Sequence, residues 1–156
     1  MFRRTIGCLA LCTAVAAALS HAGDLPEQVK PEYYKGKVVP LAGILEKSGG
    51  KLDADAIPHW LVLLAEDGKI YPLIKDDGSR MFFADTRLLK RPMRLTGRLL
   101  PGSQLLQVVV VHSFNQKNEL QEVYYWCDIC AIKRFEKKLC DCCGAPMELR
   151  EVPIKP

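Results

Sequence analysis

Five cysteines near the C-terminus are the residues whose types and spacing best suit chemistry. They occupy 17 consecutive positions and are Cys127, Cys130, Cys140, Cys142 and Cys143. Two C-x-x-C pairs, Cys127 with Cys130 and Cys140 with Cys143, have the spacing of a zinc ribbon, in which two tight turns place four sulfurs around one tetrahedral ion. Gly144 follows the second pair directly, where the backbone of such a turn often needs a positive φ. The spacing therefore predicts a four-thiolate metal site.

Two other arrangements of the same thiols remain open. An oxidising compartment would favour two disulfides, and a working redox or metal-transfer site would use Cys142 as an exposed, reactive sulfur or as an alternative ligand. Copper carriage through Cys142, Cys143 and Met147 belongs to this last class, because soft sulfur ligands select Cu(I). The structural site has the clearest physical motive, since a tail of about 17 residues cannot bury enough surface to fold alone and zinc binding would supply the missing energy. Zinc is the expected ion, with iron or copper as alternatives.

The N-terminus predicts export. Residues 1–22 combine Arg3 and Arg4 with an uncharged run of 15 residues and the small-residue ending Ser20-His21-Ala22, as in a secretory signal peptide. The run is shorter than the roughly 20 residues that span a bilayer, so no membrane anchor is expected after cleavage. Cys8 and Cys12 would be removed with the signal peptide, and the expected localisation of the protein is periplasmic or secreted.

Composition indicates a folded domain without a nucleic-acid partner. The chain of 156 residues is 49% hydrophobic and 26% charged, which is typical of a globular protein. Removing residues 1–22, which hold two arginines and no acid, leaves 20 basic and 18 acidic side chains, a net charge of about +2. A nucleic-acid-binding protein would need a more basic balance, so an unknown protein or a small molecule is the expected partner.

The apolar pattern predicts a mainly β domain over residues 38–126, after an extended leader at 23–37. The expected strands are 38–47, 59–65, 69–74, 93–100, 104–113 and 120–126, and a helix is expected from Ser79 to Pro92. Gly68 and Pro101-Gly102-Ser103 mark two hairpins. The unbroken run 108–111 indicates a strand covered on both faces. A helix between the third and fourth strands is the order of the OB-fold, a five-stranded Greek-key barrel.

The last strand runs directly into Cys127, so residues 127–147 form a cysteine-rich tail and 148–156 a C-terminal extension. Over residues 38–143 the chain resembles a group of uncharacterised exported bacterial proteins with an OB-fold-like domain. The tail, with Tyr-Tyr-Trp-Cys-Asp-Ile-Cys and Cys-Asp-Cys-Cys-Gly, also resembles the zinc-ribbon and rubredoxin type of metal knuckle. The extra Cys142 departs from that pattern and leaves the fourth sulfur undecided. The resemblance implies an exported OB-fold protein and no particular activity.

Other motifs with catalytic potential are absent from the sequence. His59 and His112 each lack a partner at ligand spacing, so ordinary surface or half-buried histidines are expected. No Gly-x-Ser-x-Gly, phosphate loop or His-Glu-x-x-His occurs. The sequence thus predicts an exported, non-catalytic binding module with a zinc site at Cys127, Cys130, Cys140 and Cys143. The alternative is a periplasmic thiol-redox or copper-handling protein that uses the same cluster.

Overall fold

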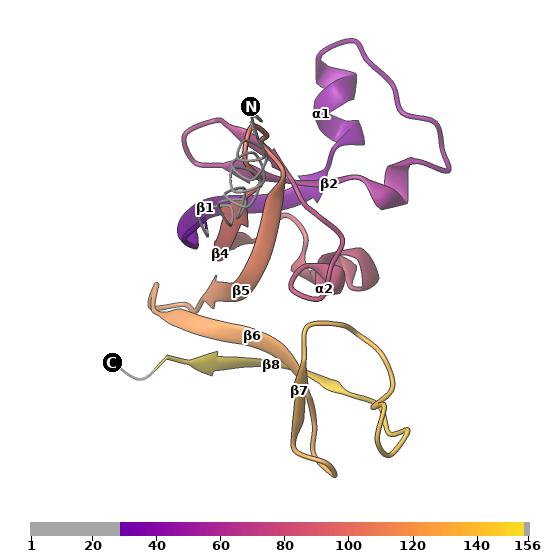
Figure 1. The fold of residues 1–156 in the computed structure, drawn as a ribbon, viewed down its shortest axis with the longest axis vertical. Coiled ribbons are helices and arrows are strands. Elements are labelled where there is room, and N and C mark those ends of the chain that lie inside the picture. The colour runs from indigo at the N-terminus through magenta and orange to yellow at the C-terminus, as the bar shows by residue number, and fades with distance from the viewer. Residues whose placement is uncertain (1–28, 155–156) are drawn as a thin grey trace, which may run out of the picture.

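The chain folds around one antiparallel β-sheet (Figure 1). The structure is a computed structural model that describes residues 29–154, so the predicted signal peptide lies outside the described residues. In this part of the chain the sheet has eight strands rather than five, and the mainly β prediction is confirmed. The strands are β1 (Glu32–Pro40), β2 (Leu61–Ala65), β3 (Ile70–Pro72), β4 (Pro92–Leu99), β5 (Leu106–Phe114), β6 (Leu120–Cys127), β7 (Ile132–Arg134) and β8 (Glu148–Pro153).

The first five strands curl toward a barrel. Their order is β3-β2-β1-β4-β5, and every pair is antiparallel. An isolated parallel bridge between Leu73 and Leu106 joins the end of β3 to the start of β5, where the Ile74 N–H donates to the Leu106 carbonyl at 3.0 Å. The two ends of this five-strand path therefore meet.

Both predicted hairpins are confirmed, β2 with β3 and β4 with β5. Gly68 and Gly102, with φ of 82° and 70°, allow their turns. The run 108–111 is not covered on both faces as predicted. The register shifts opposite Thr96 and Gly97, so Val109 is the extra residue of a bulge and is 38% exposed.

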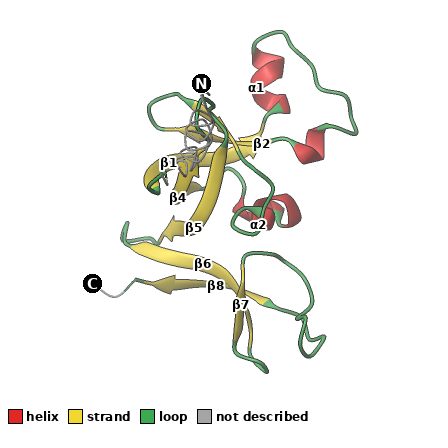
Figure 2. Ribbon diagram, viewed as in Figure 1, coloured by secondary structure: helices red, strands yellow, loops and turns green. Residues whose placement is uncertain are grey.

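The predicted first strand, 38–47, is wrong in its bounds. β1 begins at Glu32, inside the predicted leader, and α1 (Ala42–Lys47) follows the strand. Leu41, Ile44 and Leu45 have three- and four-residue spacing, which suits a helical turn as well as a strand. Figure 2 shows α1 on a long excursion between β1 and β2, away from the sheet.

The predicted helix after Ser79 is shorter than expected. α2 (Arg80–Ala84) ends at Asp85, and a 3-10 turn, Thr86–Leu88, follows. Asp85 is extended, and its carboxylate accepts the backbone N–H of Arg87, which starts the new turn. Ser79 does not cap α2 through its side chain, because its hydroxyl donates to the carbonyl of Ile74 instead.

The hydrophobic core lies between the curled strands and α2. Its largest fully buried side chains include Phe82, Leu63, Met93, Leu95 and Tyr125. Tyr125 comes from β6, and its hydroxyl donates to the buried Asp85 at 2.6 Å, where Arg87 also binds. This hydrogen bond satisfies a charge that would otherwise be costly to bury, and it ties β6 to the barrel.

β8 was not predicted as a strand. It pairs with β6 along residues 121–126, on the edge of β6 opposite to β5 and β7. Glu151 points back to the barrel and accepts both terminal nitrogens of Arg91, at 2.8 and 2.7 Å, and the hydroxyl of the buried Ser113 at 2.5 Å. A bidentate ion pair of this kind stabilises the contact and also restricts its geometry. Among residues 29–154 no helix has the length and apolar character needed to cross a membrane.

We predict that Glu151→Gln destabilises the fold at pH 7 by about 1–3 kcal/mol. Arg91, and then Ser113, hold the pKa of Glu151 below its ordinary value against the effect of burial. Since the folded pKa is the lower one, the carboxylate contributes fully above the unfolded pKa and loses its contribution as the pH falls through the folded pKa. The gap between wild type and variant, measured by urea unfolding, should therefore narrow between pH 7 and pH 3. Glu148→Gln, exposed on the same strand, is the control, and equal effects of both variants would contradict the prediction.

Candidate metal centre

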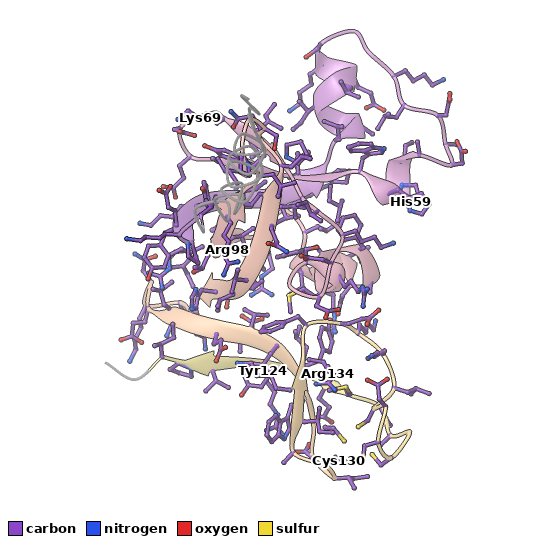
Figure 3. All side chains as sticks on the ribbon, in the orientation of Figure 1. His59, Lys69, Arg98, Tyr124, Cys130 and Arg134 are labelled. Carbon is purple, nitrogen blue, oxygen red and sulfur yellow. The ribbon has the colours of Figure 1, made fainter. Side chains whose placement is uncertain are left out.

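The structure brings together the four cysteines that the sequence pairs. Cys127 is the last residue of β6 and Cys130 lies in the turn before β7, while Cys140 and Cys143 lie in the loop before β8. Their four Sγ atoms all lie within 4.8 Å of one another. Figure 3 shows sulfur atoms gathered near Cys130, below the β6–β8 pair. Cys127 and Cys140 are buried, Cys130 is half-buried and Cys143 is exposed.

The two C-x-x-C turns have the same backbone geometry. The Ala131 N–H donates to the Cys127 carbonyl at 2.9 Å, and the Gly144 N–H donates to the Cys140 carbonyl at 2.9 Å. In both turns the residue after the second cysteine has a positive φ, 53° at Ala131 and 70° at Gly144. The predicted role of Gly144 is thereby confirmed, and Ala131 takes the same conformation without being a glycine.

The distances suit a shared ion better than paired disulfides. The Sγ atoms of Cys127 and Cys143 are 3.5 Å apart, far longer than the roughly 2.05 Å of a disulfide. A tetrahedral zinc with Zn–S bonds of about 2.3 Å would place its sulfurs about 3.8 Å apart. All five described cysteines are free thiols. Cys127, Cys130, Cys140 and Cys143 could therefore hold a metal ion.

Backbone amides favour a thiolate in the second turn. The N–H groups of Cys143 and Cys142 lower the pKa of Cys140 to about 7. Hydrogen bonds with the neighbouring thiols of Cys142 and Cys143 raise the pKa of Cys130, because they favour its protonated form. A divalent cation would oppose that effect, since it binds the deprotonated form of each thiol.

An aspartate follows the first cysteine of each pair, and both are held by basic side chains. Asp128 binds Arg150 of β8, and Asp141 binds Lys138 at 2.9 Å and Arg134 at 3.6 Å. These exposed pairs contribute little stability each. They connect the first turn to β8, through Arg150, and the second turn to β7, through Arg134.

Cys142 is exposed and stands outside the four-sulfur group. Its neighbour Cys143 belongs to that group, whereas the Cys142 thiol lies beside Cys130 and raises the pKa of that residue. Neither histidine comes to the site: His59 is exposed beyond α1, and His112 lies in β5.

Two contributors to the centre were missed from the sequence. Ala131 occupies the position equivalent to Gly144, so the internal symmetry of the two C-x-x-C turns was the available signal. The second is β8, which supplies Arg150 and Glu151. An apolar–polar alternation typical of a strand is not visible in residues 148–153, because one of the inward positions is a charged glutamate.

Comparisons with known proteins add no assignment. A scan against protein-family models finds no match to this chain, and searches of curated proteins and of solved structures also find none.

We predict that Ala131→Gly stabilises the first turn. The left-handed conformation is unfavourable for alanine by about 1–2 kcal/mol, and this cost is absent for glycine. Part of the gain is offset because glycine loses more backbone entropy than alanine on folding. The net gain should be about 0.5–1 kcal/mol. Gly144→Ala should weaken the second turn by a similar amount. Urea unfolding monitored at β8 measures both. Ala145→Gly, next to the turn at a residue without positive φ, is the control, and stabilisation by that variant instead of Ala131→Gly would contradict the prediction.

Proposed function

We propose that this protein is an exported, non-catalytic binding module in which a zinc ion, held by Cys127, Cys130, Cys140 and Cys143, fixes the C-terminal strands as part of a partner surface. The observation that carries the proposal is the convergence of the four Sγ atoms within 4.8 Å from two turns of matching geometry. Four thiolates are the donor set of structural zinc sites, which leave no open coordination position for a substrate.

The order of strands supports an OB-fold-like domain. In the barrel the helix α2 falls between β3 and β4, β1 pairs with both β2 and β4, and the Leu73–Leu106 bridge links β3 with β5 in parallel. Strands β6, β7 and β8 extend this unit. Membership of the exported OB-fold-like proteins that the tail resembles, and cleavage after Ala22, belong to the same proposal.

The ion has a clear physical task in this arrangement. Between residues 127 and 154 only Cys127, Cys140 and Met147 are buried apolar residues, so the segment has almost no core of its own. Binding of zinc supplies on the order of 10 kcal/mol in such short units. The ion would hold β7 and β8 beside β6.

The surface that depends on the ion lies on the outer face of β6. Tyr124 and Trp126 lie there with ring centroids 6.2 Å apart. Lys133 of β7 stands 4.7 Å from the Tyr124 ring, and Arg150 of β8 stands 5.4 Å from the Trp126 ring. Both cations come from strands that the metal turns position, so loss of the ion would disperse the cation–aromatic cluster.

The alternative function, thiol-redox or copper handling, is favoured by one observation. Cys142 is an exposed thiol beside the four-sulfur group. A protein of that class would need Cys142 for activity, whereas a structural zinc site would not.

We predict that Cys140→Ser and Cys143→Ser each lose zinc and unfold the segment from Cys127 to Pro153, while the barrel survives. Hydrogen exchange measures both regions in one experiment. Protection should fall at β7 and β8 and remain at β1, β4 and β5, and removal of the ion from wild type by a chelator should give the same map.

Cys142→Ser is the matched control, and it should keep about one zinc per chain with unchanged protection. Loss of zinc in that variant would mean that the ligand set is wrong. Loss of protection in barrel and tail together in Cys140→Ser would contradict the local role of the ion.

A further inference from the structure

A row of basic side chains crosses the outer face of the barrel, away from the cysteines. Lys35 of β1 lies directly opposite Arg94 of β4, and Arg94 lies directly opposite His112 of β5. Directly opposed residues of antiparallel strands point to the same face. Two more cations follow two or four residues along these strands, Lys37 on β1 and Arg98 on β4.

These cations, Lys35, Lys37, Arg94 and Arg98, form no ion pair among the described residues, although eight other basic residues do. Glu66 lies beside Lys35, and its N–H donates to the Lys35 carbonyl at 3.0 Å. Glu122 ends the row opposite His112, but Lys133 binds it. Like charges placed directly opposite each other destabilise a sheet. The pairing of Lys35 with Arg94 is therefore unfavourable for folding and calls for another explanation.

The row also holds polar atoms with unmet hydrogen-bonding capacity. Arg94 Nε and His112 Nδ1 are buried and have no partner within residues 29–154. His112 is only 8% exposed. The guanidinium of Arg94 is held in place by Tyr33, whose ring centroid lies 4.6 Å from it. Tyr33 itself is 69% exposed, so the cation is fixed next to solvent.

We propose that Lys35 and Arg94 form a binding site for a phosphoryl dianion on the outer face of β1 and β4. Two adjacent cations that form no ion pair can be neutralised by one dianion, whereas a single carboxylate would neutralise only one of them. The planar fork of arginine binds phosphate oxygens in a bidentate manner, and lysine adds a point charge. Lys37 and Arg98 extend the positive field along the strands.

The site is separate from the metal centre and does not rest on the proposed function. β1 and β4 belong to the barrel, and the cysteines lie beyond β6. The phosphoryl group could belong to a soluble phosphate ester or to a lipid headgroup, and the chemistry at Lys35 and Arg94 is the same for both.

The test uses the mature chain with inorganic phosphate at pH 8 as a soluble probe and vesicles containing phosphatidic acid as a lipid probe. Phosphate should shift the amide resonances of 33–37 and 92–98 in a saturable manner, while sodium chloride of equal ionic strength should not. Lys35→Gln and Arg94→Gln should each weaken binding about tenfold or more. Lys35→Gln should not lower the stability of the free protein, because it removes a repulsion, whereas Arg94→Gln also loses the contact with the Tyr33 ring.

Lys117→Gln is the matched control, since Lys117 is exposed in a turn and has no ion pair among the described residues. Its binding should equal that of wild type. Binding to vesicles alone, lost in Lys35→Gln, would identify a headgroup as the source and support the site. The proposal is overturned if neither probe binds, or if chloride reproduces the effect. It is equally overturned if Lys35→Gln, which cannot disturb the core, binds as wild type does.

Discussion

The meeting of two C-x-x-C turns at one point in space is the constraint on which the C-terminal part of this protein depends. Each turn needs a positive φ after its second cysteine, at Ala131 and at Gly144, and each ends in a sulfur that must lie beside three others. Such crowding is unfavourable once the sulfurs are thiolates, because like charges repel. In the function proposed above, a divalent cation would convert it into the main source of stability for a segment that has almost no apolar core.

The two C-x-x-C turns are connected to the barrel through β6, which pairs with β5 on one side and with β7 and β8 of the C-terminal segment. The buried Tyr125 of β6 is anchored in the barrel by Asp85, and the last residue of β6 is the proposed ligand Cys127. β8, which follows the second turn, returns to the barrel through Glu151 and Arg91. The C-terminal segment from β6 to β8 is therefore held at both ends by polar contacts to the barrel, while the proposed ion would hold its middle. The order of β7 and β8 can therefore depend on the proposed ion, while the order of the barrel does not.

Much of the strand pattern and the four-sulfur group could be predicted from the sequence, because hairpin turns and cysteine spacing are local signals. Gly68, Gly102 and Gly144 mark their turns by chemistry alone. The boundary between β1 and α1 could not be predicted from the sequence, because the spacing of Leu41, Ile44 and Leu45 fits a helix and a strand equally well. β8 was missed because Glu151 points inward to a partner 60 residues away in the chain, and long-range ion pairs leave no periodic trace. The opposition of Lys35 and Arg94 likewise exists only once the register of β1 and β4 is known.

X-ray absorption at the zinc edge of the purified protein tests the central claim most directly. The account predicts about one zinc per chain, with four sulfur neighbours at about 2.3 Å and no nitrogen or oxygen in the coordination shell. A protein that contains no bound metal and has its thiols joined as disulfides would contradict it.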